Sequence, residues 1–293
     1  MSGNSGENEA PQSAVLLISC PDRSGLVAAV TTFMAERGGN ILDLEQHAEE
    51  SSNSFFMRLE WDLRGFAPSL EDIAREFEPV AERFSMKWEL RRRDQLARIA
   101  LFVTKAPHCL VELLARHQAG EWAADIPLIV SNREDLRGVA ERFRIPFHHL
   151  PVVAGNKPAQ EEAARALMES HRIDLIVFAR YMQIVTGGFI RHFPNRIINI
   201  HHSFLPAFPG ARPYHQAHER GVKVIGATSH YVTEDLDAGP IIVQDVARIS
   251  HRDSVEDLIR KGRDIEKLVL ARAVTAHLEH RVLVYGNRTI VFQ

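Results

Sequence analysis

Asparagine and histidine side chains that could carry out acyl chemistry end an apolar run, RIINIHH, at residues 196–202. In an extended strand alternate residues share a face, so Asn199 and His201 point to the same side. An amide donor beside an imidazole suits two tasks of acyl transfer, which are to stabilise a developing oxyanion and to move a proton. The pair therefore predicts an acyl-transfer site at the end of this strand.

An imidazole in such a site needs a carboxylate that orients it and helps to activate the attacking group. The loop TEDLDAGP at residues 233–240 offers Glu234, Asp235 and Asp237. Spacing alone does not choose among the three. Asp237 is favoured because it lies beside the Gly239-Pro240 turn, where the backbone is fixed.

Prolines punctuate the segment that follows the RIINIHH strand. Because proline lacks an amide hydrogen and has a fixed φ, we expect Pro206, Pro209 and Pro213 to keep this segment from folding as a helix. The segment would then form a rigid rim beside the strand end.

Other catalytic motifs are absent from the sequence. It has no G-x-G-x-x-G, no P-loop and no G-x-S-x-G, which argues against a dinucleotide, a nucleotide held by a P-loop and a serine nucleophile. Water or an amine is the expected attacking group. The pairs His148-His149 and His201-His202 come without an H-E-x-x-H motif or a cysteine cluster, so we predict no metal.

The bulk composition indicates two globular domains and small-molecule chemistry. A chain of 293 residues is long for one domain, and a net charge of -3 gives no general attraction to nucleic acid or to an anionic membrane. Cys20 and Cys109 are far apart and form no C-x-x-C, which fits the reducing cytoplasm. The polar residues 1–12 are expected to be a disordered tail, with no apolar signal segment.

Residues 13–93 are predicted to form a first domain. Strands are expected at 14–19, 41–50, 54–63 and 86–92, with helices after the first and third strands. This β-α-β-β-α-β order is that of a ferredoxin-like sandwich. The charged stretch RRRDQLAR at 91–98 marks its end.

Residues 94–293 are predicted to form a second domain with a mostly parallel, open α/β sheet. Strands rich in valine and isoleucine alternate with helical segments from residue 98 to residue 202. The strands at 223–233 and 239–249 are expected to extend the sheet in antiparallel fashion. A long amphipathic helix, Val255–Leu278, and a terminal hairpin around YGNRT complete the domain.

Three segments together resemble the formyltetrahydrofolate deformylase family and, more broadly, the folate-dependent formyltransferases: NIHHSFLPAFPGARPYHQ, GATSHYVTEDLDAGPIIVQDV and VYGNRT. The resemblance covers about residues 99–293. It implies that Asn199, His201 and Asp237 are catalytic, and it settles the choice of carboxylate. It also implies that 10-formyltetrahydrofolate is the substrate and that no cofactor is needed.

The resemblance further implies a folate pocket. The segment YMQIVT matches the part of the family that contacts the pterin, largely through backbone groups, and residues 233–237 would close the other side. The folate-contacting residues expected on this basis are Met182, Gln183, Ile184, Val185, Thr233, Glu234 and Asp235.

One departure from the broader family bears on the acceptor. Glycinamide ribonucleotide transformylase has a glycine-rich, phosphate-holding turn after its first strand, whereas this chain has TKAPHC there. A proline and bulky side chains cannot offer the same run of backbone N–H groups. We therefore expect transfer of the formyl group to water, which yields tetrahydrofolate and formate and serves the one-carbon pools of purine synthesis.

The first domain resembles an ACT regulatory domain, with PDRSG at the start of its first helix and GGNI after it. Such domains bind small ligands, often amino acids, commonly at an interface between two copies. The resemblance places a regulatory ligand at Asp22, Gly25, Leu26, Asn40 and Ile41, and a homo-oligomer is expected. Two alternatives to a hydrolase remain at this point: a formyltransferase that uses an amine acceptor, and a non-catalytic sensor of folate or an amino acid.

Overall fold

The chain divides into two compact units, which are described separately. The structure is a computed structural model that describes residues 12–153, 155–207 and 213–293, so nearly all of the expected tail lies outside the described residues. The first unit holds the chain up to Leu96 together with Glu279–Leu283 and Ile290–Gln293, and the second holds Ala97–Leu278 and Val284–Thr289. The chain therefore returns to the first unit at its C-terminus, which the sequence did not indicate.

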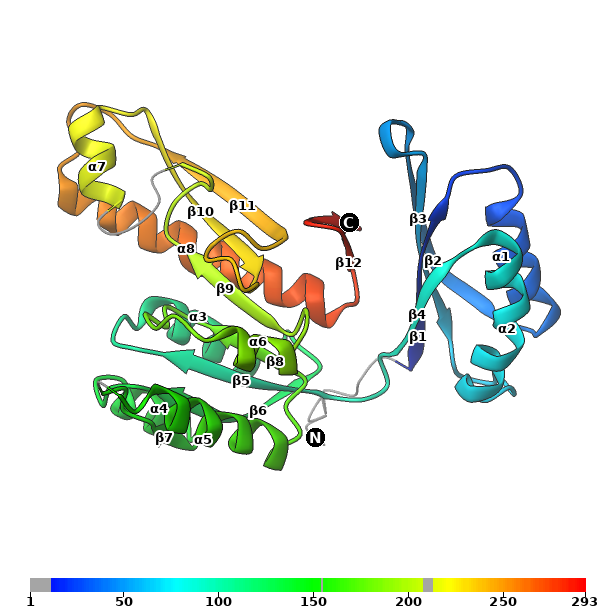
Figure 1. Cartoon of the computed structure of the whole chain (residues 1–293), viewed down its shortest axis with the longest axis horizontal. Helices are drawn as coiled ribbons and strands as arrows, with labels where there is room; N and C mark the ends of the chain where they lie inside the picture. The colour runs from blue at the N-terminus through cyan, green and yellow to red at the C-terminus, as the bar shows by residue number, and fades with distance from the viewer. Residues whose placement is uncertain (1–11, 154, 208–212) are drawn as a thin grey trace, which may run out of the picture. The chain divides into compact units, whose positions relative to one another are not determined.

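The first unit has the predicted ferredoxin-like order (Figure 1). Its elements are β1 (Ser13–Pro21), α1 (Leu26–Glu36), β2 (Asn40–Glu49), the 3-10 turn η1 (Glu50–Ser52), β3 (Ser54–Asp62), α2 (Leu70–Phe84) and β4 (Lys87–Arg92). The strands form an antiparallel sheet in the order β2-β3-β1-β4.

One face of this sheet is covered by α1 and α2, which lie side by side in Figure 1. Alternate residues of β1 and β3, such as Leu16, Ile18 and Met57, join the helices in one buried core, as expected of strands with period two. The hydroxyl of Ser69 caps α2 by accepting a hydrogen bond from the amide of Asp72.

The other face of β3 carries a buried charged network. Arg58 is almost fully buried and pairs with Glu60 and with Asp43. The Arg58 guanidinium also donates to the backbone carbonyls of Glu279 and His280. The returning C-terminal segment is therefore held on this face by a buried cation, which gives the physical reason for its place in the first unit.

Replacing Arg58 with alanine is expected to destabilise the first unit by about 3 kcal/mol, because Glu60 would remain buried without its closest cation. The same change should expose the segment after Leu278 to proteolysis. Chemical unfolding followed by mass mapping of proteolytic cuts measures both effects. Arg91→Ala removes an exposed arginine of β4 and should change stability by less than about 0.5 kcal/mol. Equal stability of the two variants would contradict this role of Arg58.

The second unit contains the predicted α/β sheet. Its strands are β5 (Ala97–Val103), β6 (Ala124–Ser131), β7 (Phe147–His149), β8 (Leu175–Phe178), β9 (Ile197–His201), β10 (Val224–Tyr231) and β11 (Ile241–Arg248). Its helices are α3 (His108–Gln118), α4 (Arg137–Arg142), α5 (Lys157–Ser170), α6 (Gly187–His192), α7 (Pro213–Arg220) and α8 (Val255–Leu278). The hairpin strands β12 (Val282–Tyr285) and β13 (Arg288–Val291) follow, and each of them is divided between the two units.

The order of the strands indicates where this sheet can bind a ligand. The order is β11-β10-β9-β8-β5-β6-β7, with parallel pairing from β9 to β7 and an antiparallel extension at β10 and β11, as predicted. The chain moves from β5 to β6 and β7, then returns to β8 on the opposite side of β5. Such a switch point opens a crevice at the carboxyl ends of the two strands, where open α/β sheets hold ligands.

Both faces of the central strands are buried. Phe102 and its same-face neighbour Ala100 pack in one core with residues of α5 and α6, while Ile99 and Leu101 on the opposite face are equally buried. On the β9 to β11 side, α8 packs against the three strands and also contacts α3 and α7. No helix among the described residues has both the length and the apolar character that a membrane span requires.

The expectation for the proline segment was wrong in its last part. Helix α7 begins at Pro213, because a proline at the first helical position loses no hydrogen bond and already has a helical φ. Pro206 lies before the helix, and Pro209 lies outside the described residues. Helix α6 was not predicted either; it begins with two glycines, which are poor helix formers.

Candidate active site

The antiparallel pairing of β9 with β10 brings polar side chains of the site together. Asn199 pairs with His230, and His201 pairs with Thr228, in an antiparallel ladder. Asn199 and His201 share one face of β9 because they are two residues apart. The amide nitrogen of Asn199 lies 3.3 Å from Nε2 of His230. A third polar side chain therefore joins the two that the sequence indicated.

Asp237 reaches this face from the loop between β10 and β11. Its φ of 54° lies in the left-handed region, which aspartate tolerates better than most residues. Gly239 packs so closely on the backbone carbonyl of Tyr231 that a Cβ atom would overlap it. This turn carries the Asp237 carboxylate to 3.1 Å from Nδ1 of His201.

The environment of Asp237 favours its charged form. Hydrogen bonds from His201 and then His230 hold the pKa of this carboxyl well below its usual value, against the opposing effect of burial. Asp237 is therefore ionised throughout the physiological pH range. The charged Asp237 carboxylate therefore faces the imidazoles of His201 and His230.

Two side chains of the site keep a hydrogen-bonding group for a ligand. Nε2 of His201 is buried and has no hydrogen-bond partner among the described residues, while Nδ1 of the same ring faces Asp237. Nδ1 of His230 lies 2.9 Å from the carbonyl of Tyr231 and donates there, while its Nε2 faces both the Asn199 amide nitrogen at 3.3 Å and Asp237 at 3.7 Å. An amide nitrogen carries two hydrogens, and Asn199 keeps one for a ligand.

This arrangement is suited to acyl chemistry at a single carbonyl. Asn199 and His201 can donate to an oxyanion, and Asp237 can hold a nucleophile and accept its proton. Sequence reasoning missed His230. One histidine in a strand carries no functional signal, and only its cross-strand register with Asn199 could have revealed it.

The predicted folate segment is anchored by its backbone at both ends. The amide of Met182 donates to Oγ1 of Thr104 at 2.9 Å, and the amide of Thr186 donates to the buried Glu161 at 2.8 Å. The Met182 and Ile184 side chains are 56% and 62% exposed, so neither is a core residue. Gln183 is half-buried, as is Val185, which packs against the core.

The second predicted folate segment lies near the first. Glu234 forms an ion pair with Arg191 of α6 at 2.7 Å, and a Cβ atom on Gly187 would collide with its carboxylate. The hydroxyl of Thr233 donates to the backbone carbonyl of Asp235. The structure thus brings the loop 233–235, which leads to Asp237, next to the start of α6, which directly follows the segment 182–186, although the Glu234 side chain itself is directed to α6.

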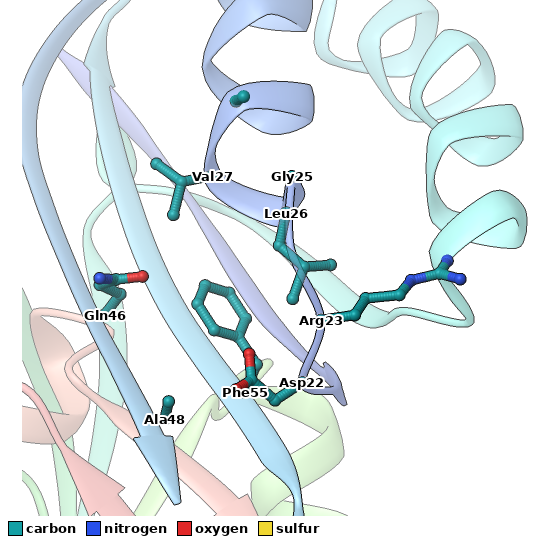
Figure 2. A pocket seen from close by; sticks show the side chains of 9 residues that line it. Asp22, Arg23, Gly25, Leu26, Val27, Gln46, Ala48 and Phe55 are labelled. Atoms are coloured by element: carbon teal, nitrogen blue, oxygen red, sulfur yellow. The ribbon is translucent and has the colours of Figure 1, made fainter.

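The first unit contains a cavity of about 440 Å³ at the start of α1. Figure 2 shows Asp22, Leu26, Gln46 and Phe55 around it, with Arg23 turned away toward α2, where its guanidinium stacks on a phenylalanine. Three of the predicted regulatory residues therefore line one cavity: Asp22, Gly25 and Leu26. Gly25 has a φ of 90°, a conformation that glycine adopts readily.

The structure does not bring the other two predicted regulatory residues to this cavity. Asn40 and Ile41 begin β2, whereas Gln46 and Ala48, near the other end of that strand, line the cavity. An extended strand rises about 3.3 Å per residue, so Asn40 lies roughly 20 Å along the strand from Gln46. The GGNI motif instead forms the turn that starts β2.

The TKAPHC turn follows β5 and leads into α3. Pro107 is the N-cap of that helix and provides no side-chain cap, and His108 points its ring to Glu266 of α8 at 2.8 Å. Lys105 is exposed. The turn therefore presents a proline and an engaged imidazole where a phosphate cradle would need consecutive free amides.

Comparison with known proteins assigns both parts of the chain to known families. Residues 97–274 match the formyl transferase family model, and residues 14–82 match the ACT domain model. A formyltetrahydrofolate deformylase from Synechocystis sp. is 55% identical over 95% of this chain and 98% of its own. The crystal structure of a formyltetrahydrofolate deformylase from Pseudomonas syringae has a TM-score of 0.93 at 47% identity, covering 97% of this chain and 96% of that chain. Glycinamide ribonucleotide transformylase 1 from Symbiobacterium toebii has a TM-score of 0.64 at 33% identity, covering 68% of this chain and 95% of that chain.

Proposed function

The chain belongs to the formyltetrahydrofolate deformylase family, and from this premise we propose that Asn199, His201 and Asp237 catalyse its reaction. The enzyme is a hydrolase that converts 10-formyltetrahydrofolate to tetrahydrofolate and formate. The observation that carries the assignment is the His201 ring, whose Nδ1 faces Asp237 and whose buried Nε2 has no hydrogen-bond partner among the described residues.

In the proposed mechanism, water attacks the formyl carbon while Asn199 and His201 donate hydrogen bonds to the formyl oxygen. Asp237 accepts a hydrogen bond from the attacking water and keeps the His201 ring oriented. A carboxylate of lowered pKa is a weak base toward free water, but an oxygen already bonded to the carbon loses its proton far more readily. The proton passes through Asp237 to the leaving nitrogen as the carbon–nitrogen bond breaks.

The proposed folate site uses the two segments beside this triad. The backbone of residues 182–185 and the loop residues 233–235 would enclose the pterin, with the exposed side chains of Met182 and Ile184 against its ring. The anchored amides at Met182 and Thr186 support this, because a recognition segment needs a fixed backbone. No metal or other cofactor has a step in this mechanism.

The reaction can be tested by formate release from 10-formyltetrahydrofolate without any added amine. We expect steady turnover under these conditions, since water is the acceptor. A folded protein that binds the substrate and releases no formate would instead support the non-catalytic sensor.

The first unit is proposed to bind a small amino acid at the cavity of Figure 2. The first amides of α1 lack partners within the helix and suit a carboxylate, while Asp22 suits an ammonium group. Calorimetric titration with a panel of amino acids, repeated on Asp22→Ala, tests this. Binding that is unchanged in the variant would exclude the site.

We propose that the protein works in the cytoplasm as a homo-oligomer and supplies formate to the one-carbon pools of purine synthesis. Both cysteines are free thiols, which suits a reducing compartment. Strand β2 is an edge strand with Leu42 half exposed, a surface that a second copy can cover. Light scattering across a concentration series tests the oligomeric state.

A further inference from the structure

A buried polar cluster lies at the switch point of the sheet and takes no part in the proposed mechanism. It consists of His108 after β5, Arg180 after β8, Tyr214 on α7 and Glu266 on α8. Glu266 is only 1% exposed and accepts from Tyr214 at 2.6 Å while facing His108 at 2.8 Å. Arg180 approaches the same carboxylate at 3.4 Å.

The cluster adjoins the catalytic histidine. The rings of His201 and His202 are 5.2 Å apart, and the rings of His202 and Tyr214 are 6.2 Å apart. Burial, followed by the charge of Arg180, lowers the pKa of His202 to about 4, so this ring is neutral between the cluster and the triad. Side chains of the chain itself therefore lie at the carboxyl ends of β5 and β8, where a doubly wound sheet would hold a ligand.

The chemistry of the cluster opposes an anionic acceptor. Burial alone would raise the pKa of Glu266, but the His108 hydrogen bond and the Arg180 charge outweigh it and lower that pKa. The Glu266 carboxylate neutralises the charge of Arg180, so this arginine adds no net positive charge that could hold a phosphate beside the turn after β5.

The cluster is also fixed in place. The Tyr214 ring packs on Gly262 so closely that a Cβ atom there would overlap the phenol, and burial, with Glu266 adding to it, raises the pKa of Tyr214 so that its hydroxyl stays a donor. If Tyr214 moved out, Glu266 would lose a donor in a buried site. The side chains therefore remain in the crevice rather than yield to a ligand.

We propose that this buried cluster occupies the space that an amine acceptor needs beside His201 and thereby restricts the formyl acceptor to water. The inference rests on the proposed function and explains its choice of acceptor. Tyr214 and His108 would be the specificity-determining residues. In a variant that admits an amine, the amine nitrogen would bond to the formyl carbon, lose a proton to the leaving nitrogen of the folate, and give a formamide and tetrahydrofolate.

The test compares acceptors in the full-length protein with 10-formyltetrahydrofolate labelled in the formyl group. Hydroxylamine, a small amine that is largely uncharged near neutral pH, is the probe, and a reaction without enzyme gives the background. We expect wild type to release labelled formate alone. Tyr214→Ala and His108→Ala should each raise the ratio of formohydroxamate to formate at least about tenfold.

Tyr214→Phe is the matched control, because it keeps the ring and removes only the hydroxyl, and its ratio should equal that of wild type. Thermal unfolding shows whether Tyr214→Ala and His108→Ala, the two opened variants, are folded. One folded opened variant is enough for the test. A folded, formate-releasing opened variant with the wild-type ratio would overturn the inference, as would abundant hydroxamate from wild type. Failure of the proposed function is distinct from these outcomes, since wild type would then release no formate without an amine.

Discussion

Replacing Asp237 with asparagine is expected to lower kcat about a hundredfold or more while folate affinity changes little. Asparagine is nearly the same size and tolerates the left-handed backbone at this position, so the loop should keep its shape. The variant loses the negative charge that faces His201 and the acceptor of the water proton. Steady-state kinetics and equilibrium binding of a non-hydrolysable folate analogue separate the two effects.

The charge of Asp237 also sets an expectation for pH dependence. Its folded-state pKa is below the usual value, so the carboxylate stays ionised as the pH falls toward the ordinary aspartate pKa of about 4. Wild-type kcat/KM should therefore show no inflection that belongs to Asp237 near that value.

Asp245→Asn, which changes an exposed carboxylate of β11 paired with Arg272, is the control for the kcat of Asp237→Asn. Near-normal kcat in Asp237→Asn would remove this residue from the mechanism.

Replacing Asn199 with alanine should lower kcat by about a hundredfold to a thousandfold, which is the usual cost of losing one oxyanion donor. KM should change less than kcat, because the donor acts on charge that develops in the transition state. The change also leaves Nε2 of His230 without its amide donor, so part of the loss reflects the position of that ring.

A surface asparagine provides the matched control for Asn199. Asn156 is exposed and precedes α5 without a side-chain cap, so Asn156→Ala should keep wild-type kcat. A loss confined to KM in Asn199→Ala would show that the amide binds the substrate without stabilising the oxyanion.

Much of the fold follows from local patterns in the sequence. A short apolar run predicts β1, alternation of apolar and polar residues is visible in the second half of β3, and valine-rich or isoleucine-rich runs predict β5, β8 and β9. The return of the C-terminal segment to the first unit could not be predicted in this way, because it depends on the buried Arg58 of a distant strand. Helix α7 was missed because Pro213 was taken as a helix breaker when it occupies the first helical position.

The proposed functional residues also differ in whether local sequence patterns reveal them. Asn199 and His201 are visible in the sequence because they are two residues apart at a strand end. His230 becomes visible only through the β9–β10 register. The cluster around Glu266 draws its members from separate loops and helices, so no sequence spacing indicates it. Asn40 was assigned to the regulatory site by motif alone, and the strand carries it away from the cavity.

The central claim is that this active site delivers the formyl group to water. The most direct test follows formyl-labelled 10-formyltetrahydrofolate with purified protein in the presence and absence of glycinamide ribonucleotide. We expect the label to appear in free formate. The amine should neither raise the rate of formate release nor receive the label, because the turn at Lys105 and His108 provides no run of free backbone amides to bind its phosphate. Label found mainly in the formylated amine would contradict the account and identify the protein as a transferase.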